Sequence, residues 1–192
     1  PKGRPYTDVV TVLAGMAGEL AKETGIERKD FRSIGLSVPG SIGPDGATVL
    51  HAYNLQFHNV PLKAAVEAAL PGPPVYLAND ANAAALAELC AGVFRGCRTA
   101  VLLTLGTGVG GGLILDGRMF NGGLANGVEL GHMCLQYGGP QCTCGNRGCI
   151  ETLCSAPWLA RQGRLSVGRH PGSEIAKKAL GDKGRVDAKI VL

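Results

Sequence analysis

The segment that decides the fold runs from Glu129 to Glu151 and reads Glu-Leu-Gly-His-Met-Cys-Leu-Gln-Tyr-Gly-Gly-Pro-Gln-Cys-Thr-Cys-Gly-Asn-Arg-Gly-Cys-Ile-Glu. One histidine and three of its cysteines follow the spacing His-x9-Cys-x-Cys-x4-Cys: His132, Cys142, Cys144 and Cys149. Imidazole and thiolate at such spacing suit tetrahedral zinc, and four protein ligands leave no open position for a catalytic water. We therefore expect a structural zinc ion, and the rival interpretation is a core histidine among buried free cysteines.

Two glutamates, Glu129 and Glu151, bracket this segment. If the metal only shapes the loop, the carboxylates that the loop holds are the candidates for functional work. Each also has a simpler interpretation. Glu129 could be a surface acid, and Glu151 could be a first-turn helix acid favoured by the helix dipole.

The composition limits the classes of function. The chain has 192 residues and a net charge of +4, which permits an anionic ligand but is far from the basic stripe of a nucleic-acid binder. No stretch is long and apolar enough to predict a membrane span. Seven cysteines, three of them in one cluster, favour metal binding in a reducing, cytoplasmic compartment over a disulfide scaffold. We expect Cys90, Cys97, Cys134 and Cys154 to be core thiols.

Hydrophobic periodicity and turn residues predict an α/β protein. We expect helices at 8–24, 61–70, 80–92, 152–164 and 173–180, and strands at 33–38, 75–77, 99–105 and 113–115. The alternation of strand and helix in the first half predicts a parallel sheet with helical crossovers. The end of the chain, 190–192, resembles an incoming strand. After Gly96 the alternation of strand and helix gives way to a strand, a glycine run and a second apolar segment, which predicts a domain boundary near 91–98.

A run of glycines follows the strand at 99–105. Glycine lets backbone N–H groups approach phosphate oxygens without a Cβ in the way, so the segment from Leu105 to Gly112 predicts a phosphate loop. Gly106, Gly108 and Gly111 match the dinucleotide fingerprint, but that motif needs a helix next, whereas a strand is expected here. The two open interpretations are a hairpin phosphate loop and a tight hairpin without a ligand.

Asn79 and Asp80 stand where a strand ends and a helix begins. Ligands of open α/β sheets bind at the carboxyl ends of strands, so Asp80 could be the general base for a hydroxyl. The alternative is an ordinary helix N-cap, which the position alone favours. Asn54 could hydrogen-bond a polar ligand or could be a turn residue.

Taken together, these motifs resemble the ROK family of sugar kinases and sugar-responsive repressors. The matching residues are Ser37-Val38-Pro39-Gly40, Asn54-Leu55, Asn79-Asp80, Leu105 to Gly112, Glu129-Leu130-Gly131-His132 and Cys142 to Glu151. The resemblance implies an actin-like ATPase (ribonuclease H-like) fold of two α/β domains with a cleft, incomplete in this chain. Residues 1–95 would be part of the N-terminal domain, and 96–192 part of the C-terminal domain.

The resemblance also implies an activity: ATP- and Mg²⁺-dependent phosphorylation of a hexose hydroxyl, with glucose as the favoured substrate, by a homodimer or homotetramer. Asp80 would be the catalytic base, and zinc would be bound by His132, Cys142, Cys144 and Cys149. The residues expected to bind the sugar are Gly40, Asn54, Asn79, Asp80, Glu129, His132 and Glu151. Those expected to face the nucleotide phosphates are Gly106, Thr107, Gly108, Val109 and Gly110.

The chain departs from the family pattern in two places. The first phosphate loop, Asp-x-Gly-Gly-Thr, and the closing C-terminal segment are not found, so we expect a fragment. The main alternative to a kinase is the sugar-sensing domain of a ROK-type repressor, and a third is a zinc-stapled scaffold without a ligand. A sensor need not keep Asp80 or the glycine run. Their presence, without a helix-turn-helix in this chain, favours the enzyme.

Overall fold

The computed structural model describes residues 3–122 and 128–192. The strands in this part of the chain are β1 (Ile34–Val38), β2 (Ser41–Ile42), β3 (Val49–Ala52), β4 (Phe57–Val60), β5 (Val75–Asn79), β6 (Ala100–Leu105), β7 (Val109–Leu115) and β8 (Arg118–Phe120). The helices are α1 (Tyr6–Thr24), α2 (Leu62–Ala69), α3 (Asp80–Ala91), α4 (Glu151–Cys154), α5 (Ala156–Arg169), α6 (Glu174–Lys178) and α7 (Ala188–Val191), with short 3-10 turns η1 (Arg28–Asp30), η2 (Leu130–His132) and η3 (Lys183–Arg185).

The chain divides into two compact units. Unit 1 comprises Pro1–Ala100 and Leu113–Val128, and unit 2 comprises Val101–Gly112 and Glu129–Leu192. The antiparallel sheet β6-β7-β8 contributes residues to both units, because the β6–β7 turn belongs to unit 2 and β8 belongs to unit 1. The expected domain boundary near residues 95 and 96 stays a prediction.

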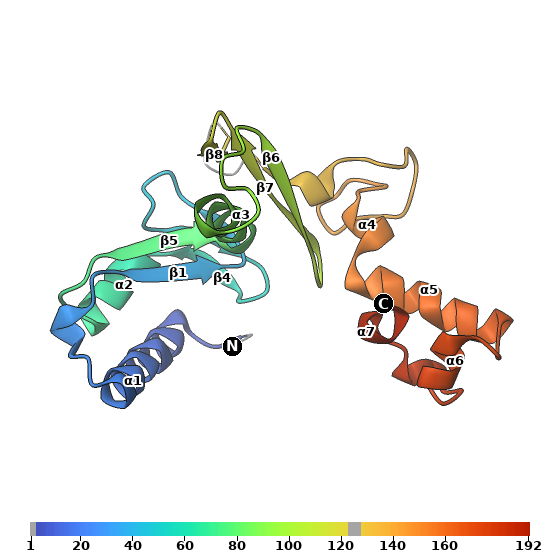
Figure 1. The fold of residues 1–192 in the computed structure, drawn as a ribbon, viewed down its shortest axis with the longest axis horizontal. Helices are drawn as coiled ribbons and strands as arrows, with labels where there is room; N and C mark the ends of the chain where they lie inside the picture. The colour runs from blue at the N-terminus through green and yellow to red at the C-terminus, as the bar shows by residue number, and fades with distance from the viewer. Residues whose placement is uncertain (1–2, 123–127) are drawn as a thin grey trace. The chain divides into compact units, whose positions relative to one another are not determined.

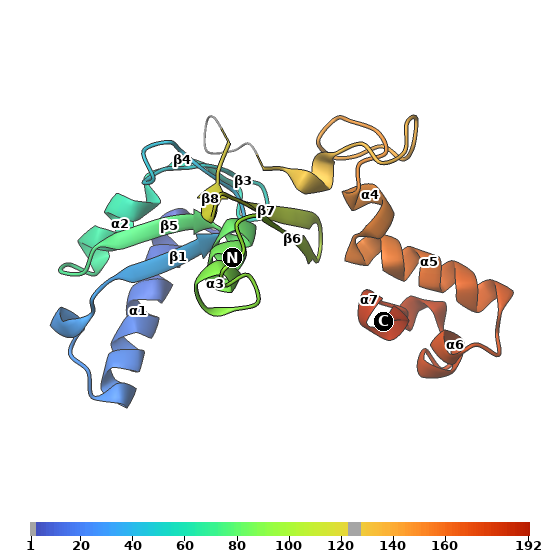
Figure 2. The same cartoon turned by 45° about the horizontal axis from the view of Figure 1, so that its top comes forward.

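Unit 1 contains the predicted parallel strand pair. β1 and β5 run side by side, with Ile34 opposite Val75 and Val38 opposite Asn79. Figures 1 and 2 show α1 and α2 on one face of this pair and α3 on the other. The core between the strands and α1 and α2 includes the fully buried side chains of Val66 and Val75. Because the carboxyl ends of β1 and β5 meet at one edge, the residues that follow each strand are brought together there.

A second sheet in unit 1, β2-β3-β4, was not predicted from the sequence. Its strands pair antiparallel, with Val49 opposite Val60 and His51 opposite His58. These strands have two to four residues, which is too short for an alternating pattern to stand out. The sheet adds Val49 and Phe57 to the core and places the Gly40 loop against β3.

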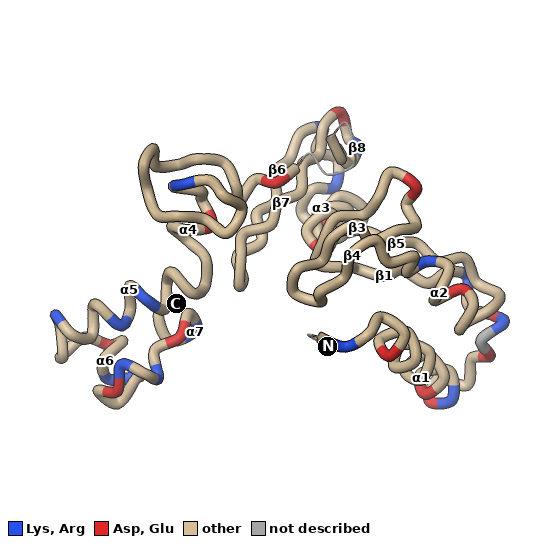
Figure 3. Tube along the Cα trace, turned by 180° about the vertical axis from the view of Figure 1, so that it is seen from behind, with Lys and Arg blue, Asp and Glu red and all other residues tan. Residues whose placement is uncertain are grey.

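Unit 2 is held together by a smaller core. The side chains of Val167, Ala176, Ala179 and Val186 form it, with α5 packed against α6 and α7. Lys and Arg residues are spaced along α5 to α7 with acidic residues among them (Figure 3). Lys177 pairs with Glu174 at 2.6 Å. That pattern is typical of a solvated helical surface.

Two predicted elements in unit 2 differ from the structure, the first at one residue and the second in its type. The helix expected at 152–164 is interrupted at Ser155, which is extended with ψ 162°, because Pro157 near the start of α5 cannot donate to a preceding turn. The strand expected at 190–192 is instead part of α7, whose N-cap Asp187 accepts a hydrogen bond from the backbone N–H of Ile190 at 2.9 Å.

The expectation of four core thiols was also wrong. Cys90, Cys97 and Cys134 are exposed, and Cys154 is half-buried. Cysteine is among the residues most often buried, but that tendency does not decide a single position. The helices α1, α2 and α3 and the strands β1, β5 and β6 lie where they were predicted, within two residues at each end. Among the described residues, no helix has both the length and the apolar character that crossing a membrane requires.

Candidate functional site

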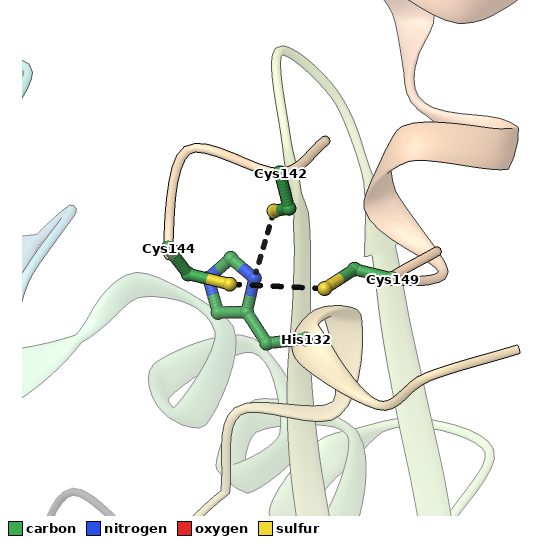
Figure 4. A group of neighbouring side chains, drawn as sticks. All are labelled: His132, Cys142, Cys144 and Cys149. Atoms are coloured by element: carbon green, nitrogen blue, oxygen red, sulfur yellow. Dashed lines mark hydrogen bonds between the residues drawn. The ribbon is translucent and has the colours of Figure 1, made fainter. Parts of the chain in front are cut away.

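Four side chains in unit 2 converge on one point. The donor atoms of His132, Cys142, Cys144 and Cys149 all lie within 4.8 Å of one another (Figure 4). Nδ1 of His132 is 3.6 Å from Sγ of Cys142, and the sulfurs of Cys144 and Cys149 are 3.7 Å apart. Zinc with tetrahedral bonds to nitrogen and sulfur sets its donors about 3.5–3.8 Å apart. The donor set and its spacing therefore fit a tetrahedral zinc ion.

The backbone of the cysteine loop is folded by its own hydrogen bonds. The N–H of Cys142 donates to the carbonyl of Asn146 at 2.8 Å, and the N–H of Gly145 donates back to the carbonyl of Cys142 at 3.1 Å. Gly148 has φ 71°, and a Cβ there would overlap the carbonyl of Gln136, so only glycine fits. These contacts bring Cys142, Cys144 and Cys149 to the same side of the loop.

The thiols of this cluster differ in acidity. A hydrogen bond from the backbone N–H of Asn146 lowers the pKa of Cys144. Burial, followed by the neighbouring Cys144 and Cys142, raises the pKa of Cys149 to about 12. Three thiolates at this spacing repel one another, and a divalent cation reverses that repulsion because a coordinating thiol is deprotonated outright. The chemistry of the donors thus favours a cation at their centre.

Glu151, the first residue of α4, connects the cysteine loop to the glycine turn. Its Oε2 accepts a hydrogen bond from the backbone N–H of Val109 at 3.0 Å, and its Oε1 lies 4.0 Å from Sγ of Cys142. The carbonyl of Gly106 accepts a second bond across the same gap, from the N–H of Ala156 at 2.8 Å. The turn between β6 and β7 is therefore anchored to the start of both α4 and α5.

Close packing explains several glycines of this region. A Cβ on Gly108 would overlap the Glu151 carboxylate, and one on Gly111 would come within 2.7 Å of the Leu130 side chain. Gly131 is equally constrained, because its Cβ would overlap the carbonyl of Val109. Gly110, Gly111 and Gly112 lie in β7 rather than in the turn. This packing is a reason for glycine that the sequence did not reveal.

Two further residues of unit 2 that were predicted to bind the sugar lie at the two ends of η2. Glu129 precedes the turn and is exposed, and His132 ends it and is half-buried. The N–H of His132 donates to the carbonyl of Glu129 at 3.0 Å, so the two residues are held close in the backbone.

In unit 1, Asn79 ends β5 and caps α3. Its Oδ1 accepts hydrogen bonds from the backbone N–H groups of Ala81 at 2.9 Å and Asn82 at 3.1 Å. Its Nδ2 donates to the carbonyl of Gly40 at 3.1 Å, which ties the loop after β1 to the start of α3. The N-cap is therefore Asn79, and Asp80 is the first helical residue. The capping interpretation of Asp80 was wrong.

Asp80 itself is exposed at the carboxyl end of β5. Within the described residues its carboxylate accepts one hydrogen bond, from the N–H of Ala81 at 3.0 Å. Asn54 lies in the exposed turn after β3, and Gly40 packs so tightly on β3 that a Cβ would overlap the carbonyl of His51. Asp80 thus keeps acceptor capacity for a ligand, because its neighbour satisfies the helix end.

The chain is similar in sequence to proteins of known function. A sequence profile of the ROK family matches residues 2–188. The chain belongs to the ROK family. The glucokinase of Halalkalibacterium halodurans is 39% identical over 150 residues, which cover 78% of this chain and 45% of that protein. The xylose repressor of Caldicellulosiruptor bescii is 39% identical over 153 residues, which cover 80% of this chain and 38% of the repressor.

A solved structure supports the same assignment. The crystal structure of a ROK family glucokinase from Streptomyces griseus, in complex with glucose and AMPPNP, matches with a TM-score of 0.74 and 30% identity, covering 92% of this chain and 57% of that one. The predicted α/β class and the actin-like ATPase fold of the ROK family are confirmed by this likeness. The chain spans about half the length of the curated relatives it matches.

One residue that shapes the cysteine loop of this ROK chain, Gln141, was not predicted from the sequence. Nε2 of Gln141 donates to the carbonyls of Cys142, Gly145 and Asn146 at 3.2–3.3 Å, and its Oε1 accepts from Arg147 at 3.2 Å. Gln141 therefore holds the turn that carries Cys142 and Cys144. A sequence signal for this role exists: an amide side chain stands directly before Cys-x-Cys. The carbonyl groups of such a tight turn need a hydrogen-bond donor, which an amide can supply.

Proposed function

We propose that the protein to which this chain belongs transfers the γ-phosphoryl group of ATP to a hydroxyl of a hexose. The observation that carries the proposal is Asp80. It stands at the carboxyl end of β5 with an exposed carboxylate, while Asn79 satisfies the end of α3. A carboxylate that accepts only one hydrogen bond among the described residues keeps the capacity to accept the proton of a sugar hydroxyl as that oxygen attacks phosphorus.

The roles of the other residues are those that the family resemblance implies. Gly40, Asn54, Asn79, Glu129, His132 and Glu151 would hydrogen-bond sugar hydroxyls, each of which both donates and accepts. Carboxylates give the strongest of these bonds because they are charged. The glycine turn and the first residues of β7, Gly106 to Gly110, would face the phosphates. When bound, ATP supplies the phosphoryl group, and Mg²⁺ neutralises its charge.

We further propose that the cysteine cluster holds a structural zinc ion. Four donors at tetrahedral spacing leave no position for substrate, so the ion would act through the shape of the loop. It would bind one nitrogen of His132 and so orient the ring toward the sugar. It would also keep Glu151 at the distance from which its carboxylate accepts the N–H of Val109.

We propose glucose as the sugar because the relatives include glucokinases and a glucose-bound structure. A cytoplasmic location and a homo-oligomeric state belong to the same proposal. The competing function is sugar sensing in a repressor, which the xylose repressor at 39% identity favours. Both functions use the same sugar ligands, but only the kinase needs the carboxylate of Asp80.

The test is a coupled assay of ADP release by the full-length protein with a panel of hexoses. Asp80→Asn should leave sugar binding intact and lower kcat by about 10²–10⁴-fold, the usual contribution of a general base. Asp116→Asn is the matched control, since Asp116 is exposed in the β7–β8 turn at φ 51°, where asparagine is well tolerated. Sugar binding without ADP release above the ATP-only blank would favour the sensor and refute the kinase.

A further inference from the structure

Cys134 lies directly across a two-stranded ladder from the metal-loop residue Cys149. The two residues form an isolated antiparallel β-bridge. Its hydrogen bonds run from the N–H of Leu135 to the carbonyl of Gly148 at 2.8 Å and from the N–H of Ile150 to the carbonyl of Met133 at 3.0 Å. These bonds flank the pair without joining it, so Cys134 and Cys149 are a non-hydrogen-bonded pair, the closer of the two kinds of antiparallel pair.

The geometry of such a pair suits a disulfide. Cα atoms of a non-hydrogen-bonded pair are about 4.5 Å apart, and both side chains point to the same face of the ladder. Disulfides accept Cα separations of about 4.4–6.8 Å. A change of side-chain rotamer, with the backbone in place, is therefore enough to bring the two sulfurs together.

The thiols of Cys134 and Cys149 differ in solvent exposure and in whether they belong to the donor cluster. Cys134 is exposed and is not one of the four clustered donors, whereas Cys149 is fully buried among them. A peroxide in solution can reach the sulfur of Cys134, and Cys149 is the cysteine paired with it across the ladder. Cys90 and Cys97 are also exposed, but they belong to unit 1, and in the part of the chain that the structure describes neither forms a β-bridge with the loop.

We propose that Cys134 and Cys149 form an oxidation site at which hydrogen peroxide or a similar peroxide makes a disulfide. The peroxide oxidises the Cys134 sulfur to a sulfenic acid and leaves as one water. The Cys149 sulfur then attacks that sulfur, the S–S bond forms, and the hydroxyl leaves as a second water. Two thiols and one peroxide thus give one disulfide and two waters.

Disulfide formation removes Cys149 from the donor cluster. For the zinc part of this inference, which rests on the proposed metal site, the loop keeps three donors and releases its ion. The N–H of Thr152 donates to the carbonyl of Cys149 at 3.0 Å, at the start of the helix that carries Glu151. We therefore expect that oxidation of Cys134 also affects the position of Glu151, the acid that accepts a hydrogen bond from the glycine turn.

The experiment treats the zinc-loaded, full-length protein with hydrogen peroxide and follows metal release with a chromophoric chelator. Cys134→Ser should release zinc severalfold more slowly than the unchanged protein. Cys97→Ser, which removes an exposed cysteine of unit 1, should release it at the unchanged rate. Release from Cys134→Ser as fast as from the other two proteins would overturn the proposal.

Peptide mapping without reduction identifies the disulfide itself. Trypsin alone does not distinguish the partners of Cys149, because no Lys or Arg lies between Cys134 and Cys144. Added chymotrypsin cleaves after the fully exposed Tyr137 and separates Cys134 from Cys142 and Cys144. We expect Cys149 linked to the Cys134 peptide, and a Cys144–Cys149 link in its place would refute the site. The same mapping on metal-free protein tests the disulfide even if the metal proposal fails.

Discussion

The substitution Gly108→Ala tests whether the glycine turn is built around Glu151. A Cβ at this position would overlap Oε2 of Glu151, the atom that accepts the N–H of Val109 at 3.0 Å. The carboxylate must move away, and the hydrogen bond is lost. A hydrogen bond to a charged group contributes about 1.5–3 kcal/mol, and this range is the upper bound for the destabilisation, because the clash is with the end of the flexible Glu151 side chain. For a chain of this length, that bound corresponds to a fall in Tm of about 3–12 °C.

The matched control lies in the same turn. A Cβ on Gly106 meets nothing within 4 Å, so Gly106→Ala should change stability by less than about 0.5 kcal/mol. Urea unfolding of the two variants measures the difference. A double-mutant cycle then isolates the contact: in a Glu151→Ala background the added methyl of Gly108→Ala should cost little, giving a coupling of about 0.5–3 kcal/mol. Equal losses for both glycines, or zero coupling, would refute the packing explanation.

Two further predictions concern unit 1. Gly40→Ala places a methyl group against the carbonyl of His51 and should cost about 1–3 kcal/mol by urea unfolding, whereas Gly35→Ala, with open space around it, should be neutral or slightly stabilising; similar losses at both would argue against the packing of Gly40 on β3. Asp45 accepts hydrogen bonds from the N–H groups of Ala47 and Thr48, which lower its pKa below 3.8. Because the folded-state pKa is the lower one, this stabilisation is present above pH 3.8 and disappears as the pH falls through the folded-state value. Asp45→Ala should therefore be less stable than the unchanged protein at neutral pH, with a difference that vanishes in acid, and a difference independent of pH would contradict the assignment.

The sequence predicted the parts of the fold that have a strong local signal. The helix at the start of the chain and the Asn79-Asp80 junction follow from periodicity and strand-end position. The donor cluster follows from ligand spacing, since His132 and Cys142 are ten residues apart in one loop and could converge without long-range help. The α/β class and the residues grouped in unit 2 were therefore within reach of sequence reasoning.

The remaining features depend on tertiary contacts that leave no local pattern. Asn79 caps α3 through bonds from Ala81 and Asn82, and its amide is also tied to the Gly40 carbonyl, 39 residues away in sequence. The reason for glycine at 108 is a carboxylate 43 positions later, Glu151. The exposure of Cys134, and its place opposite Cys149, follow from the ladder that the folded loop creates. Periodicity and composition carry none of this information.

The most direct measurement is the metal content of the purified protein and two variants by elemental analysis. We expect about one zinc ion per chain, bound by the four donors that lie within 4.8 Å of one another. Cys144→Ser should lose most of the zinc and bind sugar more weakly, while Cys97→Ser, whose cysteine lies outside the cluster, should keep both. Zinc-free protein that binds sugar with full affinity, or Cys144→Ser with undiminished zinc, would contradict the claim that a bound ion shapes this site.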